Sequence, residues 1–502
     1  MVRSMKNTLA PINRVPQVVL SLIPDHCETD QELITMTHVC RGWREQFISR
    51  SSLWTFLDCT SVDQTRVYLE RSKTFPLEIW LGEETRGPFL HDAFLLTVPH
   101  LGRLKSLSIS GSSNNLVELT KHFLHCRAPL LEKLRIRSTS DDFLTIQGAI
   151  FDGDLLSLRE LRFSGAFTDL PWRNLSNLMT FDFRQVPGDG ISVARFLDFF
   201  EGAPVLRTIK LWNVLPGTSD APRERVVSLP HLKSLDIVAW PTHSILLNRL
   251  SIPAGASLVL SFTFGNEKSP IPAYLPSSKN LGHLSRVASI NLSHMVTIND
   301  PRGEPGVSLR VEGPNGGLYM YGNWDGAPPS SAVAGRQVLH ILNHFDISTT
   351  RNLTITQCGT SPPPKIENSP AYKTLLRMNA LRTLTLTHCL HLPFIFTLDP
   401  NRIPSKTVAC PELEELVLYV KTKDRFYIKE LLEMTKERAS RGAGLSTITI
   451  VCPQEFVAAR EVLRLRDHVS SVEYRLDHVV PKWDDIPNVG GGTGDGTDRD
   501  WY

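Results

Sequence analysis

The sequence predicts an α/β fold in which a small module of three helices precedes an irregular solenoid of strand–helix repeats with one β-hairpin insertion. Three observations predict this arrangement. Apolar residues recur along most of the chain in the pattern Leu-x-x-Leu-x-Leu, and segments with helical apolar spacing lie between the copies. The N-terminal residues carry a different, purely helical pattern that begins with a proline and includes a capping box.

Composition excludes several functional classes. The chain has 502 residues, 21% of them charged, and a formal net charge of +2, so it lacks the basic field of a dedicated nucleic-acid-binding protein. Its longest uncharged apolar run, Ile252–Phe264, is too short to span a membrane. No secretory signal follows Met1–Pro11, and the 8 cysteines form no Cys-x-x-Cys pair. We therefore expect a cytoplasmic or nuclear protein with no membrane or nucleic-acid partner.

The N-terminal module combines three helical signals. The run Val15–Ile23 is apolar on nearly every side, has Pro16 in its first turn, and so needs two burial surfaces. Thr29-Asp30-Gln31-Glu32 is a capping box that opens a second helix, which we expect to end near Ile48. The pair Leu53-Trp54 follows. A module of this size cannot bury all these side chains by itself, so part of its apolar surface predicts a partner.

Most of the remaining chain repeats. Each final Leu-x-Leu predicts a short strand whose alternate side chains point inward, and stacking of such strand–helix units buries a continuous core. The spacing of roughly 20 to 32 residues within each half of the chain is typical of leucine-rich repeats, although it is long and uneven. The middle anchors that set this spacing are Leu107, Leu134, Leu161, Phe181, Ile209 and Leu235, followed by Leu353 of a weaker copy and by Leu384, Leu416 and Ile448.

Three segments break the repeat. Within residues 299–335, the alternating residues from Val307 to Met320 predict a hairpin closed by Asn-Gly, which we interpret as an insertion. The proline-rich segment 359–370 predicts an exposed loop, either a plain connector or a ligand for a proline-binding domain. The glycine-rich tail is expected to be disordered. The predicted parts are an N-terminal tail (1–11), the helical module (12–57), a connecting helix with a first irregular repeat (58–98), the repeat region (99–483) and the C-terminal tail (484–502).

The N-terminal residues carry a family resemblance. The order Val-Pro, Val-Leu-x-x-Ile, Val-Cys-x-x-Trp and Leu-Trp resembles an F-box, and Tyr68–Lys73 with Pro76–Ile79 resembles the joining segment in the large F-box and leucine-rich-repeat families of mushroom-forming fungi. Two departures, Gln17-Val18 where the family has Pro-Glu and Pro24-Asp25 after the first helix, predict that this helix ends early. The positions that match the family's adaptor contacts and small core are Val15, Pro16, Leu20, Ile23, Val39, Cys40, Trp43, Leu53 and Trp54.

The resemblance implies a function. An F-box binds a Skp-type adaptor protein, and through it a cullin and a RING ligase, while the repeat domain holds a protein substrate for ubiquitin transfer. The chain would then be a substrate-recognition subunit of an SCF-type ubiquitin ligase. The alternative is a non-catalytic leucine-rich-repeat scaffold in which the N-terminal helices only cap the solenoid, because solenoids need capped ends.

The strand register also predicts a substrate surface. Solvent-facing strand positions in the first half form a basic stripe, with Asp182 and Asp236 interspersed. Guanidinium groups bind carboxylates and phosphates bidentately, so the stripe predicts an acidic or phosphorylated protein segment as its ligand. The alternative is a strand face that is merely solvated. The stripe consists of Arg135, Arg137, Arg162, Arg184, Lys210 and Trp212.

Catalytic and metal motifs are missing from the sequence. It holds no Gly-x-Ser-x-Gly elbow, His-Glu-x-x-His motif, Walker loop or dinucleotide fingerprint, so we expect neither an enzyme nor a cofactor. The cluster His388, Cys389 and His391 has the residue types of a metal site. However, Cys389 fills the slot that leucine-rich repeats give to Asn or Cys, and no second ligand pair has zinc-site spacing. We expect no metal.

Overall fold

A computed structural model of the chain describes residues 16–27, 30–82, 91–123, 126–140, 143–153, 155–169, 175–186, 191–214, 225–239, 246–253, 255–264, 287–295, 306–313, 316–324, 339, 342–356, 369–387, 391–403, 407–420, 427–452 and 463–476. The expected tails 1–11 and 484–502 lie outside these ranges. The fold is mixed α/β, with mostly parallel strand pairing. Two compact units divide the chain, Met1–Val287 with Val296–Pro328 and His344–Asp346, and Ala288–Met295 with Pro329–Asn343 and Ile347–Tyr502.

Short helices open the first unit. They are α2 (Gln17–Leu20), the 3-10 helix η2 (Ile23–His26), α3 (Asp30–Thr37), α4 (Arg41–Ser49) and the 3-10 helix η3 (Ser51–Trp54). The first helix follows Pro16, whose carbonyl accepts hydrogen bonds from the N–H groups of Val19 and Leu20, and it ends early, as the sequence predicts. The single helix expected from Thr29 to Ile48 is wrong. Cys40 has extended backbone (φ −158°, ψ 172°) and separates α3 from α4, after a last turn in which the Thr37 hydroxyl bonds the Ile34 carbonyl.

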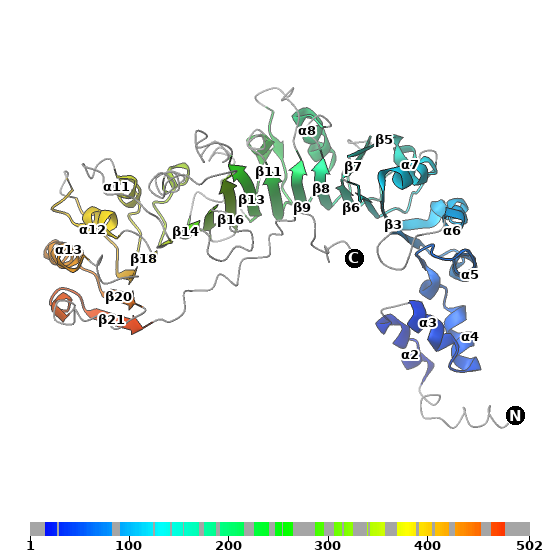
Figure 1. The fold of residues 1–502 in the computed structure, drawn as a ribbon, viewed down its shortest axis with the longest axis horizontal. Coiled ribbons are helices and arrows are strands. Elements are labelled where there is room, and N and C mark those ends of the chain that lie inside the picture. The colour runs from blue at the N-terminus through cyan, green and yellow to red at the C-terminus, as the bar shows by residue number, and fades with distance from the viewer. Residues whose placement is uncertain are drawn as a thin grey trace. The chain divides into compact units, whose positions relative to one another are not determined.

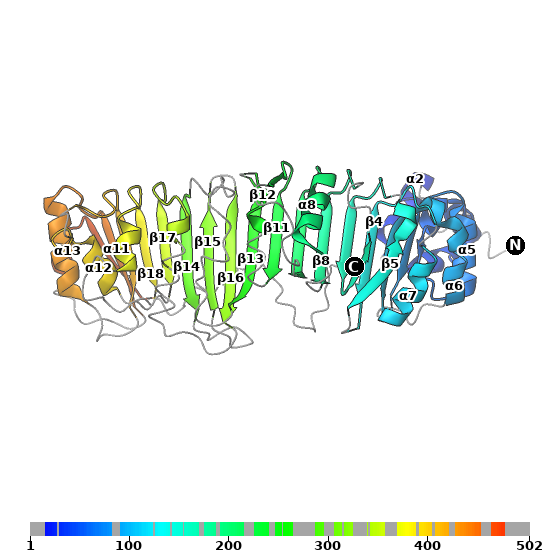
Figure 2. The same cartoon turned by 90° about the horizontal axis from the view of Figure 1, so that it is seen from above.

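Parallel strands form the body of the first unit (Figures 1 and 2). Each strand of the main sheet pairs with the next in the series. The predicted anchors lie opposite one another in this pairing, Leu107 beside Leu134, then Leu161, Phe181 and Ile209, and all are buried. The repeat register predicted from sequence is therefore the observed one. The strands are β1 (Phe56–Leu57), β2 (Leu77–Leu81), β3 (Leu104–Gly111), β4 (Lys133–Ser138), β6 (Glu160–Ser164), β8 (Thr180–Val186), β9 (Thr208–Val214), β11 (Ser234–Ala239) and β13 (Ser257–Phe264).

Helices and two small strand pairs connect these strands. The pairs are β5 (Leu144–Ala149) with β7 (Ala166–Asp169), and β10 (Val227–Ser228) with β12 (Leu250–Ser251). Helix α7 packs against β3 and β5, and α8 packs against β10. The helices are α5 (Val62–Ser72), α6 (His91–Leu95), η4 (Val98–Arg103), α7 (Ser113–Lys121), η5 (Ile150–Gly153) and α8 (Val193–Gly202).

The predicted hairpin is present, but it is not an insertion outside the repeat. Strands β15 (Gly306–Glu312) and β16 (Gly317–Trp324) pair antiparallel. Strand β16 also pairs in parallel with β13, with Leu318 opposite Leu258 and Met320 opposite Leu260. The physical reason is that Leu318 and Met320 fill the same buried positions as the repeat anchors. The second strand of the hairpin therefore takes the place of a repeat strand.

The second unit has the same construction. Its strands are β14 (Ser289–Met295), β17 (Asn352–Thr356), β18 (Thr383–Thr387), β19 (Glu415–Tyr419), β20 (Thr447–Cys452) and β21 (Ser471–Leu476), each parallel to the next. The helices between them are α11 (Pro370–Leu375), α12 (Leu392–Leu398) and α13 (Ile428–Ser440), and the 3-10 helix η9 (Leu342–His344) precedes β17. The anchors Leu353, Leu384, Leu416 and Ile448 again lie opposite one another and are buried.

Backbone hydrogen bonds fix the register between successive repeats. Just before most strands, one carbonyl accepts two consecutive N–H groups of the next repeat. The Arg207 carbonyl accepts from residues 233 and 234, and the Arg382 carbonyl accepts from residues 414 and 415. Because these polar groups are satisfied between repeats, each repeat sets the entry point of the following strand.

Candidate functional site

The nine predicted adaptor residues separate into core and surface. Leu20 and Trp43 are buried in one cluster with Met36 and Phe47. Partly buried residues pack against this cluster, and they include the predicted positions Ile23, Cys40 and Leu53. Trp43 meets the ring of Phe47 edge to face at 5.4 Å. These residues hold the helices together.

Trp54 is also a core residue. It is 0% exposed, and its indole N–H donates to the Phe47 carbonyl at 3.0 Å. Its ring meets Tyr68 of α5 edge to face at 5.1 Å, and the guanidinium of Arg71 lies 4.4 Å from the ring centre. Trp54 therefore joins the N-terminal helices to α5 and cannot contact a partner without unfolding. Val15 lies outside the described residues.

The exposed apolar surface lies on neighbouring positions. Pro16 and Val39 are exposed, as two of the predicted contacts should be. Val18 is 74% exposed, Leu22 is 54% exposed, and Val19 is exposed as well. These last three residues were not among the predicted contacts, although the signal that points to them, a first helix apolar on nearly every side, is present in the sequence. We define Pro16, Val18, Val19, Leu22 and Val39 as the N-terminal apolar surface.

The predicted basic stripe follows one face of the first unit's sheet. Arg135 lies opposite Arg162, Arg162 opposite Asp182, and the series continues to Lys210 and Asp236. Two residues further along these strands, Arg137 lies opposite Ser164, and Arg184 lies opposite Trp212. The structure thus brings all six predicted residues onto adjacent strands in register.

Carboxylates neutralise part of this stripe. Glu160, which was not among the predicted residues, forms ion pairs with both neighbouring arginines through one oxygen: Oε1 lies 2.8 Å from Arg135 Nη2 and 2.7 Å from Arg162 Nε. Its signal in the sequence was its place two residues before Arg162 on the same strand face. One carboxylate oxygen of Glu160 therefore lies between the guanidinium groups of two neighbouring strands.

The other end of the stripe is a packed ionic cluster. Asp182 and Arg184 are both buried and form a two-pronged ion pair, at 2.9 Å from Nε to Oδ1 and 3.1 Å from Nη2 to Oδ2. The Arg184 guanidinium stacks 4.1 Å from the Trp212 ring centre. Burial raises the pKa of Asp236, and the indole of Trp212 and the charge of Lys210 oppose this rise. Arg184 and Trp212 are therefore committed to contacts within the protein.

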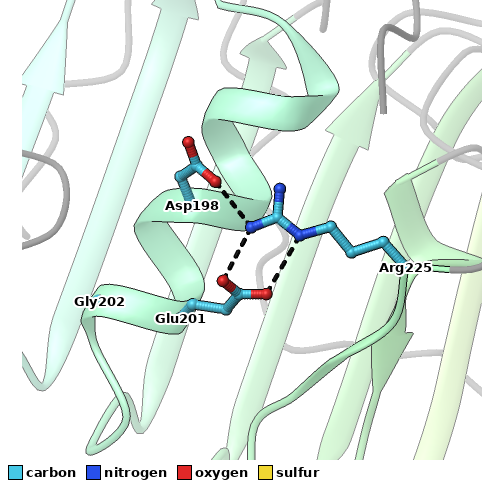
Figure 3. A pocket seen from close by; sticks show the side chains of 4 residues that line it. All are labelled: Asp198, Glu201, Gly202 and Arg225. Carbon is cyan, nitrogen blue, oxygen red and sulfur yellow. Dashed lines mark hydrogen bonds and ion pairs between the residues drawn. The ribbon is translucent and has the colours of Figure 1, made fainter. Parts of the chain in front are cut away.

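A hollow on the helix side is lined by residues that pair with one another (Figure 3). Asp198, Glu201 and Gly202 of α8 line it together with Arg225. The Arg225 guanidinium bonds Asp198 at 2.7 Å and Glu201 at 2.8 Å. Both bonds raise the pKa of Arg225, and the bond to Glu201 has the larger effect. Because the cation is already paired with two carboxylates, the hollow has no evident use as an anion site.

Metal and membrane features were sought in the described part of the chain. Its residues contain no group of three or more His, Cys, Asp or Glu side chains arranged for a metal ion. Of the predicted His–Cys cluster, His388 and Cys389 lie outside that part, and His391 lies within it and is buried. None of the helices described is both long and apolar enough to cross a bilayer. The chain matches no protein-family model and no curated protein.

Proposed function

We propose that this protein is the substrate-recognition subunit of an SCF-type ubiquitin ligase. In this proposal the N-terminal helices are an F-box that binds a Skp-type adaptor and, through it, a cullin. The strand–helix repeats are a leucine-rich-repeat-like solenoid that binds the protein substrate. The protein itself is not an enzyme, uses no cofactor, and acts in the cytoplasm or nucleus.

The N-terminal apolar surface carries this proposal. The module already has a core in Leu20, Met36, Trp43 and Phe47, yet Val18 and Leu22 remain more than half exposed. Apolar side chains gathered on one small module are typical of a protein–protein contact. The alternative, a scaffold with a simple end cap, would have no need for such residues on the outer side of α2.

The sheet face supports an acidic substrate segment at one end only. Arg135 and Arg162 lie side by side on β4 and β6, and guanidinium groups bind a carboxylate or phosphate bidentately. Lys210 lies between Asp182 and Asp236 in register and adds no net positive charge there. We therefore propose that the acidic or phosphorylated ligand binds on the strands β4 and β6.

Capture of a Skp-type adaptor tests the proposal. The parent chain and a Val18→Asp plus Leu22→Asp variant would each be co-expressed with a tagged adaptor and purified through the tag. We expect capture of the parent and loss of capture by the variant, because two carboxylates in a desolvated interface lack partners. Val226→Asp, at a site that is 51% exposed elsewhere in the first unit, is the matched control and should bind normally.

Two outcomes would count against the proposal. Failure of the parent to bind the adaptor would favour the scaffold alternative. Binding that the double change leaves intact would show that the contact lies elsewhere on the module. Where capture succeeds, charge reversal of Arg135 and Arg162 should remove co-purifying acidic clients while adaptor binding persists.

A further inference from the structure

Two histidine rings lie against each other where α6 and α7 stand side by side in the first unit (Figures 1 and 2). The imidazole of His91, at the start of α6, lies 5.7 Å from the imidazole of His122, measured between ring centres. His122 follows α7 directly and keeps helical backbone (φ −73°, ψ −17°). Two imidazoles bound to one tetrahedral metal ion have ring centres about 5 Å apart, because each nitrogen lies about 2 Å from the metal. The observed separation is close to this value.

A buried aromatic ring holds both imidazoles in place. Phe94 of α6 is 0% exposed, and its ring centre lies 6.3 Å from that of His91 and 5.7 Å from that of His122. Phe94 itself packs edge to face on the buried ring of Phe123. His91 is exposed and His122 is half-buried, so a dissolved ion can reach the pair. Because the rings are already held close together, little conformational entropy is lost when an ion joins them.

A carboxylate lies one helical turn before His122. Residues at positions i and i+4 of a helix are neighbours on one face, which places Glu118 beside His122. The hydrogen bond and charge of Lys121 lower the pKa of Glu118, and the charges of His91 and His122 lower it further. Both imidazoles are therefore near enough to act on this carboxylate.

The present partner of Glu118 is replaceable. Its Oε1 accepts a hydrogen bond from Lys121 Nζ at 2.6 Å, and both side chains are more than half exposed. Exposed ion pairs of this kind contribute little to stability. A divalent ion between the imidazoles would attract the carboxylate more strongly than one solvated ammonium does.

We propose that His91, His122 and Glu118 bind one divalent transition-metal ion, with Zn²⁺ as the best match. Zinc takes histidine nitrogen and glutamate oxygen as ligands, and a water molecule can fill its fourth position. Calcium and magnesium prefer oxygen ligands alone and fit this set poorly. In the structure Glu118 is paired with Lys121, so the three side chains are not yet grouped around one point, and a rotation of Glu118 completes the site.

The role of the ion would be structural. Helices α6 and α7 belong to successive repeats, since α6 precedes β3 and α7 follows it. An ion that ligates His91 from one helix and His122 from the next would tie these repeats together. This site is independent of the adaptor and substrate contacts proposed above.

Hydrogen exchange of the full-length, tag-free chain with and without Zn²⁺ tests the site. Peptides that cover 91–103 and 113–123 should exchange more slowly with zinc, because the ion joins the two helices. His91→Gln and Glu118→Gln should each weaken zinc binding by at least about tenfold, since loss of even an outer partner of a metal ligand has an effect of that size. His231→Gln, at an exposed histidine elsewhere in the first unit, is the matched control and should behave as the parent does.

Lys121→Met separates this site from adventitious binding to surface histidines. The change removes the ammonium that competes for Glu118, so it should strengthen zinc binding, and Glu118→Gln in the same chain should abolish most of that gain. Absence of zinc-dependent protection of these peptides in the parent would overturn the proposal. Protection that persists unchanged in His91→Gln would overturn it as well, and so would zinc that protects only other parts of the chain.

Discussion

Arg438 in α13 provides a sharp test of how the repeats are joined. Its side chain is fully buried, and its Nη1 and Nη2 donate to the carbonyls of Ala409 and Cys410 at 2.7 and 2.8 Å. No carboxylate of the described residues pairs with it, and burial lowers its pKa. The guanidinium therefore acts as a double donor that closes the turn before β19, at the cost of desolvating its charge.

The effect of Arg438→Met follows from these contacts. The Cys410 carbonyl also accepts from the Leu413 N–H at 3.1 Å, so this oxygen keeps a partner. The Ala409 carbonyl loses the donor it has from Arg438, which costs about 1–3 kcal/mol for a buried polar group. Loss of the second charged hydrogen bond adds to this, and removal of a buried charge offsets part of it. We expect a net destabilisation of about 2–3 kcal/mol.

Two further variants separate hydrogen bonding from packing. Arg438→Lys keeps a charge but cannot donate to both carbonyls from one planar group, so it should destabilise the unit more than methionine does. Lys436→Met, on an exposed position of the same helix, should change stability by less than about 0.5 kcal/mol.

Hydrogen exchange measured by mass spectrometry is the suitable assay for these variants. A chain of two units need not unfold in one step, so a local measurement is required. Peptides that cover 407–420 and 427–440 should exchange faster in Arg438→Met and faster still in Arg438→Lys. Protection in Arg438→Met equal to or above that of the parent would refute the reasoning, because desolvation of the guanidinium would then outweigh its hydrogen bonds.

Two further predictions concern buried acidic groups. Asp182→Asn leaves the buried Arg184 without its carboxylate and should cost about 3 kcal/mol in chemical denaturation. Asp236→Asn should instead stabilise the protein at pH 7. Burial raises the pKa of the Asp236 carboxyl, so as pH rises above about 4 the unfolded chain releases the carboxyl proton before the folded chain does. The stability that the protonated carboxyl contributes is therefore lost as pH rises through the raised pKa. Equal changes in the free energy of unfolding for Asp182→Asn and Asp236→Asn would contradict this prediction. Burial also raises the pKa of Cys59 and of Cys410 to about 12, so stability should fall as pH rises from 9.0 toward 12, and iodoacetamide at pH 8 should modify both thiols only after unfolding, as read by peptide mapping.

The repeat register was predictable because it depends on burial alone. Leu134, Leu161 and Phe181 recur in one pattern, and side chains with that pattern can be buried only if adjacent strands pair in register. The hairpin was predictable for the same reason, since Leu309 and Met320 alternate with polar residues. Its place in the sheet was not predictable, because pairing of β16 with β13 joins residues that are far apart in sequence.

The N-terminal module was predictable in composition but not in exposure. Its apolar residues identify a small helical unit with more apolar surface than it can bury. Which of them form the core depends on how the helices cross, and the break at Cys40 sets that crossing. Trp54 was predicted as a contact and Val18 was not, yet Trp54 is fully buried and Val18 is 74% exposed.

The basic stripe shows that the pattern of charges in the sequence is not enough to predict where an anion binds. Counting solvent-facing positions correctly places Arg135, Arg162 and Arg184 on adjacent strands. The count cannot say which carboxylate reaches which guanidinium, because that depends on rotamers across strands. Glu160 forms ion pairs with two arginines, whereas both carboxylate oxygens of Asp182 contact Arg184. One carboxylate therefore contacts two guanidinium groups at β4 and β6, whereas β8 holds a closed pair of one carboxylate and one guanidinium.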